Sequence, residues 1–66
     1  MQILVNGQPK DIPEAQDVRA LVLSLGLNPE GVAVALNAEV IPRSRQAQTL
    51  LTEGDKIEVI RAVGGG

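Results

Sequence analysis

The 66-residue chain contains no cysteine, no histidine and no aromatic residue. Without cysteine there is neither a disulfide nor a thiolate metal site. Without histidine the chain lacks the side chain that most often transfers protons near neutral pH and binds transition metals. Without aromatic rings it has no platform on which nucleic-acid bases stack. These absences argue against redox, metal-dependent and acid–base enzymes and against a protein that binds single-stranded nucleic acid.

Charge and hydropathy argue against further classes of partner and location. The net charge is −2 and the sequence pI is near 4.8, which disfavours a nucleic-acid or anionic membrane partner. No apolar run approaches the roughly 20 residues of a membrane span. The residues after Met1 lack the basic and apolar regions of a secretion signal. We therefore expect a small cytoplasmic protein, monomeric when free, that forms one domain and buries about 60% of its unfolded surface.

The polar residues that are present form no recognisable catalytic pattern. No histidine is available to activate the hydroxyls of Ser24, Ser44, Thr49 and Thr52 as nucleophiles. The eight Asp and Glu residues are spread along the chain, where solvation and helix capping are their expected roles. The glycines at the end are followed by neither Lys-Ser/Thr nor a helix, so they form no phosphate-binding loop. The sequence predicts no catalytic residue, no metal site and no bound cofactor.

The amino-terminal part predicts a β-hairpin. Residues 2–5 are rich in β-formers, and Asn6-Gly7 is a strong signal for a type I′ turn because both residues tolerate a positive φ. The chain is expected to return as a second strand over residues 8–12. Pro9 cannot donate a hydrogen bond to a neighbouring strand, so this second strand belongs at an edge of the sheet.

Residues 17–26 predict the main helix. Asp17 is a good N-cap, and Gly26 suits the left-handed position just beyond the helix. Leu27 is then expected to fold back onto Val22 in a Schellman ending. Leu23 is expected to be exposed. Apolar residues spaced by three and four positions form one stripe along the helix, at Val18, Leu21, Val22 and Leu25.

The second half predicts a strand over residues 32–36, a tight connection, and a short strand over residues 40–41. Residues 43–51 are ambiguous and are expected to hold one short helical turn. Leu50 and Leu51 are both expected to close one end of the core.

The last strand leads directly into three terminal glycines. Ile57 and Val59 alternate with charged residues, as in a half-buried strand. We expect a domain over residues 1–62 and a flexible tail over residues 63–66, because glycine has the greatest backbone freedom. A tail without side chains could thread a narrow channel and reach roughly 13–14 Å from the domain. The alternative is a frayed end without a function.

The order of these elements predicts an α+β fold with a mixed four- to five-stranded sheet and one main helix on one face. Pairing the last strand in parallel with the first, in the middle of the sheet, gives the β-grasp or ubiquitin-like fold. The predicted core joins the helix stripe to six strand residues, namely Ile3, Val5, Val34, Leu36, Ile57 and Val59.

This arrangement leaves one face of the sheet open. Leu4 and Ile60 are expected to point outward on adjacent strands, near Ala33 and Ala35, as a docking surface for a partner. The alternative is a few unrelated apolar residues at the surface. With Leu4 and Ile60, the candidate docking residues include Arg61 and Val63.

The chemistry that remains is that of the Gly66 carboxylate, with Gly64 and Gly65 as the segment that threads into a partner. At pH 7 this carboxylate is ionised and a poor electrophile (pKa about 3.3–3.7). Another protein must first activate it, for instance as an acyl-adenylate formed from ATP. Attack by sulfide or a persulfide then gives a thiocarboxylate, and attack by a lysine amine gives an isopeptide-linked tag.

The chain as a whole resembles the ThiS family of sulfur carriers of thiamin biosynthesis, within the ubiquitin-like superfamily. The resemblance rests on the segments MQILVNGQ, VAVALNAEVIPRS, EGDKIEVIRAV and the terminal GGG. It implies that a ThiF-type adenylyltransferase activates Gly66 with ATP and that a cysteine desulfurase supplies the sulfur. The thiocarboxylate would then serve the thiazole synthase ThiG. The alternatives are the small subunit of molybdopterin synthase, a protein-modifying tag, and a β-grasp binding module with an inert tail.

Overall fold

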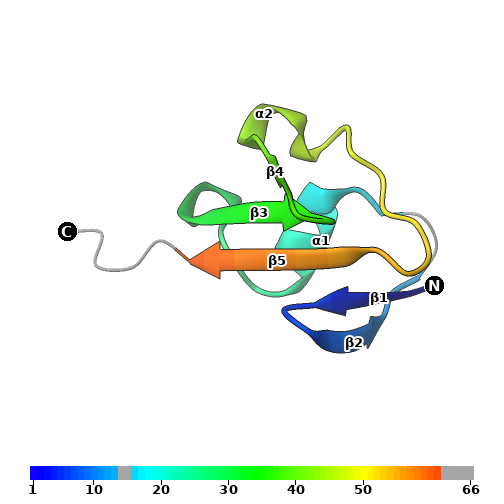
Figure 1. The fold of residues 1–66 in the computed structure, drawn as a ribbon. Coiled ribbons are helices and arrows are strands. Elements are labelled where there is room, and N and C mark those ends of the chain that lie inside the picture. Colours follow the sequence, from blue (N-terminus) through cyan, green and yellow to red (C-terminus); the bar gives the residue numbers. More distant parts are fainter. Residues whose placement is uncertain (14–15, 62–66) are drawn as a thin grey trace.

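The computed structural model describes residues 1–13 and 16–61, which form one five-stranded mixed sheet packed against one main helix (Figure 1). The strand order is β2-β1-β5-β3-β4. The last strand is therefore central, parallel to β1 and antiparallel to β3. This topology confirms the predicted β-grasp fold. The elements are β1 (Gln2–Val5), β2 (Gln8–Asp11), α1 (Val18–Ser24), the 3₁₀ helix η1 (Pro29–Gly31), β3 (Val32–Leu36), β4 (Glu39–Ile41), α2 (Arg43–Gln46) and β5 (Lys56–Arg61).

The first hairpin forms as its turn residues predict. Asn6 and Gly7 have φ values of 51° and 80°, the positive values that a type I′ turn requires. The edge position of β2 accommodates Pro9, as expected. β2 ends at Asp11, one residue earlier than predicted, and Ile12 turns into the core instead.

Local signals at both ends define α1. The Asp17 carboxylate accepts a hydrogen bond of 2.7 Å from the Ala20 amide, which confirms the predicted N-cap. At the other end Gly26 has a φ of 78°. The Leu27 amide donates to the Val22 carbonyl oxygen at 3.3 Å, and the Gly26 amide donates to that of Leu23 at 3.0 Å. These two bonds are those of a Schellman motif, so the predicted ending is confirmed.

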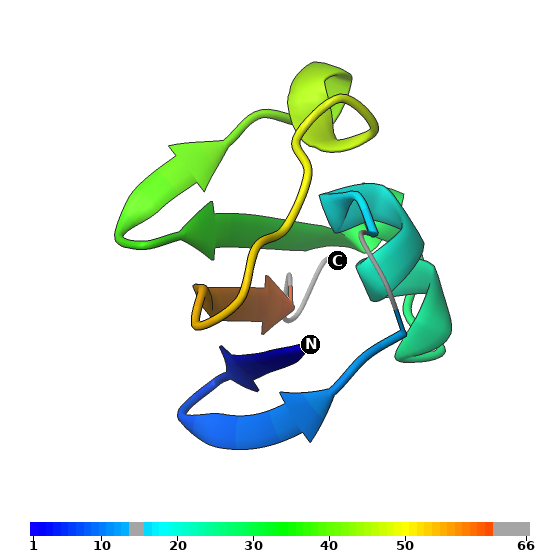
Figure 2. The same cartoon turned by 90° about the vertical axis from the view of Figure 1, so that its right-hand side faces the viewer.

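The core lies between α1 and the sheet. Figure 2 shows α1 against one face, while no helix among the described residues covers the other. Four residues predicted for the core are only partly buried against it: Val5, Leu25, Leu36 and Val59. The fully buried apolar residues are Ile3, Ile12, Val18, Leu21, Val22, Val34, Leu51 and Ile57.

The prediction that both Leu50 and Leu51 close the core is wrong for one of them. Leu51 is 1% exposed, whereas Leu50 is 63% exposed. Leu50 forms an extended bridge with Asp17, and the Leu51 amide donates to the Gln16 carbonyl oxygen at 2.8 Å. In extended backbone successive side chains point to opposite sides, so only one of the two leucines can face inward.

Candidate functional site

The central position of β5 determines where the chain leaves the sheet. On one side β5 pairs with β3 up to Arg61, which lies opposite Val32. On the other side it pairs with β1 only through Lys56 and Ile57. In Figure 1, β5 runs away from the end of the sheet at which Met1 lies.

The residues predicted to react and to thread lie beyond this strand. Gly64, Gly65 and Gly66 fall outside the described residues, and so do Val63 and the predicted boundary between residues 62 and 63. Arg61 is the last residue that the structure describes, and it is exposed.

An apolar patch lies on the open face of the sheet across β5, β3 and β4. Ile60 is 59% exposed and lies opposite the exposed Ala33. Val40 is 71% exposed and lies opposite Ala35. Because Ala33 and Ala35 are two positions apart on one strand, all four side chains share a face. We call these four residues the open-face patch. Val40 was not predicted to belong to it, because the sequence did not indicate the register of β4 against β3.

The register separates Leu4 from this patch. Leu4 lies opposite Lys56 and is partly buried. Ile60 lies four positions further along β5, or about 13 Å at the usual rise of a strand, with Glu58 between them. Arg61 adjoins Ile60 in sequence, so its side chain points to the other face. Leu4 contributes instead to a shallow depression of about 460 Å³ lined by Leu4, Asn6, Gly7, Lys56, Ile57 and Glu58.

The polar contacts near the start of β5 support the fold. The buried Asp55 carboxylate accepts hydrogen bonds from the Thr52 amide at 2.8 Å, the Thr52 hydroxyl at 3.1 Å and the Asn37 side-chain amide at 3.1 Å. These bonds fix the loop before β5 against the β3–β4 turn. Every side-chain oxygen and nitrogen of Asp55, Thr52 and Asn37 has a hydrogen-bond partner within the fold, so this group is structural and not a reactive centre.

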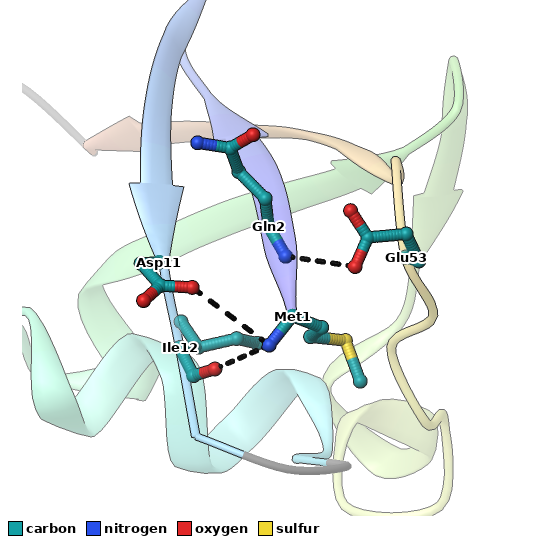
Figure 3. A network of polar contacts seen from close by, with 5 residues as sticks. All are labelled: Met1, Gln2, Asp11, Ile12 and Glu53. Carbon is teal, nitrogen blue, oxygen red and sulfur yellow. Dashed lines mark hydrogen bonds and ion pairs between the residues drawn. The ribbon is translucent and has the colours of Figure 1, made fainter.

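A second group of polar contacts holds the start of β1 (Figure 3). The Met1 amino group donates to the Ile12 carbonyl oxygen at 2.8 Å and lies 3.8 Å from the Asp11 carboxylate. The Gln2 backbone amide donates to the Glu53 carboxylate at 3.0 Å. Together these contacts join β1 to the end of β2 and to the loop before β5.

The described part of the chain contains neither a cluster of metal ligands nor a membrane-spanning helix. Within residues 1–13 and 16–61, no three His, Cys, Asp or Glu side chains are grouped so that they could hold a metal ion. No helix in those ranges is both long enough and apolar enough to cross a membrane.

Comparison with known proteins places the chain in a family. The sequence model of the ThiS family matches residues 3–66. The chain belongs to the ThiS family. This membership confirms the resemblance that the sequence segments indicated.

Individual relatives agree with the ThiS family match. The sulfur carrier protein ThiS of Escherichia coli is 35% identical over 66 residues, which cover all of both chains. The thiamine biosynthesis protein (ThiS) of Geobacter metallireducens has a crystal structure that superposes with a TM-score of 0.86 at 35% identity, over the full length of both chains.

Two larger relatives are named thiazole synthase. Those of Paramagnetospirillum magneticum and Magnetococcus marinus are 36% and 38% identical to the whole of this chain. The chain spans only 20% of the length of each. A stretch similar to this ThiS-family chain therefore occurs within longer proteins of that name.

Proposed function

We propose that this protein is a sulfur carrier of thiamin biosynthesis, whose Gly66 carboxylate is converted to a thiocarboxylate that gives up its sulfur during thiazole formation. The observation that carries the proposal is the ThiS family match, which runs through the terminal glycines to Gly66. The central position of β5 supports it, because this strand leads from the middle of the sheet towards those glycines. The same match favours this function over that of a molybdopterin synthase subunit or a protein-modifying tag.

The reaction needs two displacements at Gly66. A carboxylate oxygen attacks the α-phosphorus of ATP, and pyrophosphate leaves as the acyl-adenylate forms. A sulfur nucleophile then attacks the activated carbonyl carbon, and AMP leaves with the original carboxylate oxygen. When the nucleophile is a persulfide, the product is an acyl disulfide, and a thiol then reduces its S–S bond. The thiol ends in a disulfide with the donor's sulfur, and the carrier is left with a thiocarboxylate in which sulfur has replaced one carboxylate oxygen. The chain supplies the carboxylate, while the ATP site and the catalytic groups belong to the activating enzyme. In this proposal the chain is a co-substrate and not itself an enzyme.

Membership of the ThiS family implies three partners for this chemistry. A ThiF-type adenylyltransferase activates the carboxylate, a cysteine desulfurase supplies persulfide sulfur, and the thiazole synthase ThiG accepts it. The occurrence of similar stretches within proteins named thiazole synthase supports the third partner. The cytoplasmic location and the monomeric state stay predictions.

The first test is the intact mass of the chain after incubation with ATP, a ThiF-type enzyme, a cysteine desulfurase and cysteine. We expect a mass gain equal to the replacement of one oxygen by sulfur. A variant lacking Gly66 should show no gain, while its circular dichroism spectrum stays that of the folded protein.

The ThiS protein of Escherichia coli serves as the positive control in the same mixture. If that protein gains sulfur and this chain does not, the proposed function is wrong. If both gain sulfur, adding ThiG or the large subunit of molybdopterin synthase identifies the protein that consumes the thiocarboxylate.

A further inference from the structure

Asn6 makes three hydrogen bonds to β5 across more than fifty positions of sequence. Its backbone amide donates to the Ile57 carbonyl oxygen at 2.8 Å. Its side-chain Oδ1 accepts from the Val59 amide at 2.8 Å, and its Nδ2 donates to the Val59 carbonyl oxygen at 3.3 Å. Both polar groups of the Val59 backbone are therefore bonded to one side chain.

These contacts extend the parallel pairing of β1 and β5 beyond the end of β1. At Asn6 the backbone enters the left-handed region with a φ of 51° and turns away into β2. The carboxamide carries the same donor and acceptor as a peptide group. It therefore occupies the place that the next residue of β1 would have taken, had the strand continued. Val59 lies only two positions before Arg61, the last residue of β5.

Asn37 makes comparable contacts at the opposite end of β5. It too is left-handed, with a φ of 50°, and lies in the turn between β3 and β4. Its Oδ1 accepts from the Lys56 amide at 3.0 Å, and its Nδ2 donates to the Asp55 carboxylate at 3.1 Å. Two asparagines in equivalent turns thus hold β5, one at its start and one towards the end that leads to the tail.

We propose that Asn6 is a positioning residue for the carrier reaction, because it fixes the direction in which β5 leaves the sheet and so where the Gly66 carboxylate is presented. This role rests on the function proposed above. Without the Asn6 side chain, the Val59 backbone loses its partners on that edge, and β3 alone pairs with the end of the strand. The open-face patch is still available for docking. The carboxylate then reaches the partner's active site in fewer of the bound complexes, which lowers kcat more than it raises KM.

The experiment compares Asn6→Gly with Asn37→Gly as a matched control. Glycine adopts a positive φ without strain, so each variant keeps its turn and loses two side-chain hydrogen bonds to β5 or the residue before it. At a temperature at which both variants are folded, we expect Asn6→Gly to lower kcat for thiocarboxylate formation about fivefold, with KM nearly unchanged. Asn37→Gly should leave both constants near the wild-type values.

Amide hydrogen exchange gives a readout that does not depend on the partner enzyme. Exchange at Val59 should accelerate in Asn6→Gly, whereas exchange at Lys56 should accelerate in Asn37→Gly. Asn6→Asp keeps the oxygen that accepts from the Val59 amide, so it should retain more of the wild-type kcat than Asn6→Gly.

If wild-type protein forms thiocarboxylate, three results would overturn the positioning role. The two glycine variants could lower kcat equally, which indicates a loss of stability only. Asn6→Gly could raise KM at constant kcat, which indicates docking, or it could change neither constant. If wild-type protein itself forms no thiocarboxylate beside a working positive control, the proposed function fails, and the positioning role fails with it.

Discussion

Three non-glycine residues in the described part of the chain adopt the left-handed conformation, and they are not equivalent. Asn6 and Asn37 each gain hydrogen bonds to β5 or its preceding residue from that position. Ala38, with a φ of 72°, has no polar side chain with which to compensate. Left-handed backbone costs an ordinary L-residue about 1–2 kcal/mol. The β3–β4 turn therefore stores strain at one alanine.

Replacing Ala38 by glycine should stabilise the protein. Glycine removes the left-handed strain but gives the unfolded chain more freedom, which offsets about 0.4–1 kcal/mol. We expect a net gain of roughly 0.5–1 kcal/mol in the free energy of unfolding, measured by urea denaturation. Ala33→Gly is the control. Ala33 lies within strand β3, where glycine costs backbone entropy, so this variant should lower the free energy of unfolding. A loss of similar size in both variants would contradict the strain at Ala38.

Among the elements, those with local signals were predictable from the sequence. The seven residues of α1 are too few for a stable isolated helix, yet Asp17 and Gly26 define its ends through contacts within a few positions. The segment between α2 and β5 has no such signal. Its path is set by long-range bonds to residues 16–18, such as the Val18 amide donating to the Thr49 carbonyl oxygen at 3.0 Å. Which of two adjacent leucines faces the core could therefore not be predicted.

The two leucines of this segment provide a matched test. Leu51→Ala should lower the free energy of unfolding by about 2–5 kcal/mol, because it opens a cavity in the core. Leu50→Ala should change it by no more than about 0.5 kcal/mol, because this side chain is exposed. Thermal unfolding followed by circular dichroism measures both. Equal losses would show that Leu50 is packed as well.

For the whole molecule, the alternation of residues predicted the faces of the sheet but not its register. Pairing β1 with β5 followed from the order of the elements. The offset between the strands depends on the lengths of the turns and loops, and it places Leu4 away from Ile60. The register between β3 and β4 brings Val40 beside Ala35. The candidate docking surface is consequently shifted towards β4. The threading and reactive roles of Gly64, Gly65 and Gly66 stay predictions from the sequence and the family.

The position of the open-face patch predicts how the protein docks with the activating enzyme proposed above. Ile60→Ala should raise KM for adenylation about tenfold, as expected when an apolar residue near the centre of an interface is lost. Leu23→Ala is the control, because Leu23 is similarly exposed, at 54%, but lies on α1. Steady-state kinetics with varied carrier concentration measures both. If Ile60→Ala and Leu23→Ala have the same KM for adenylation, the open-face patch is not the docking surface.

The central place of β5 also affects how the protein is made. β5 is the only link in the sheet between the β1–β2 hairpin and the β3–β4 hairpin among the described residues, and isolated hairpins are at best marginally stable in water. The ribosome must therefore release this strand before the sheet can close. A copy whose synthesis stops before β5 stays unfolded and is open to proteases. Such incomplete copies cannot compete with complete copies for the activating enzyme proposed above.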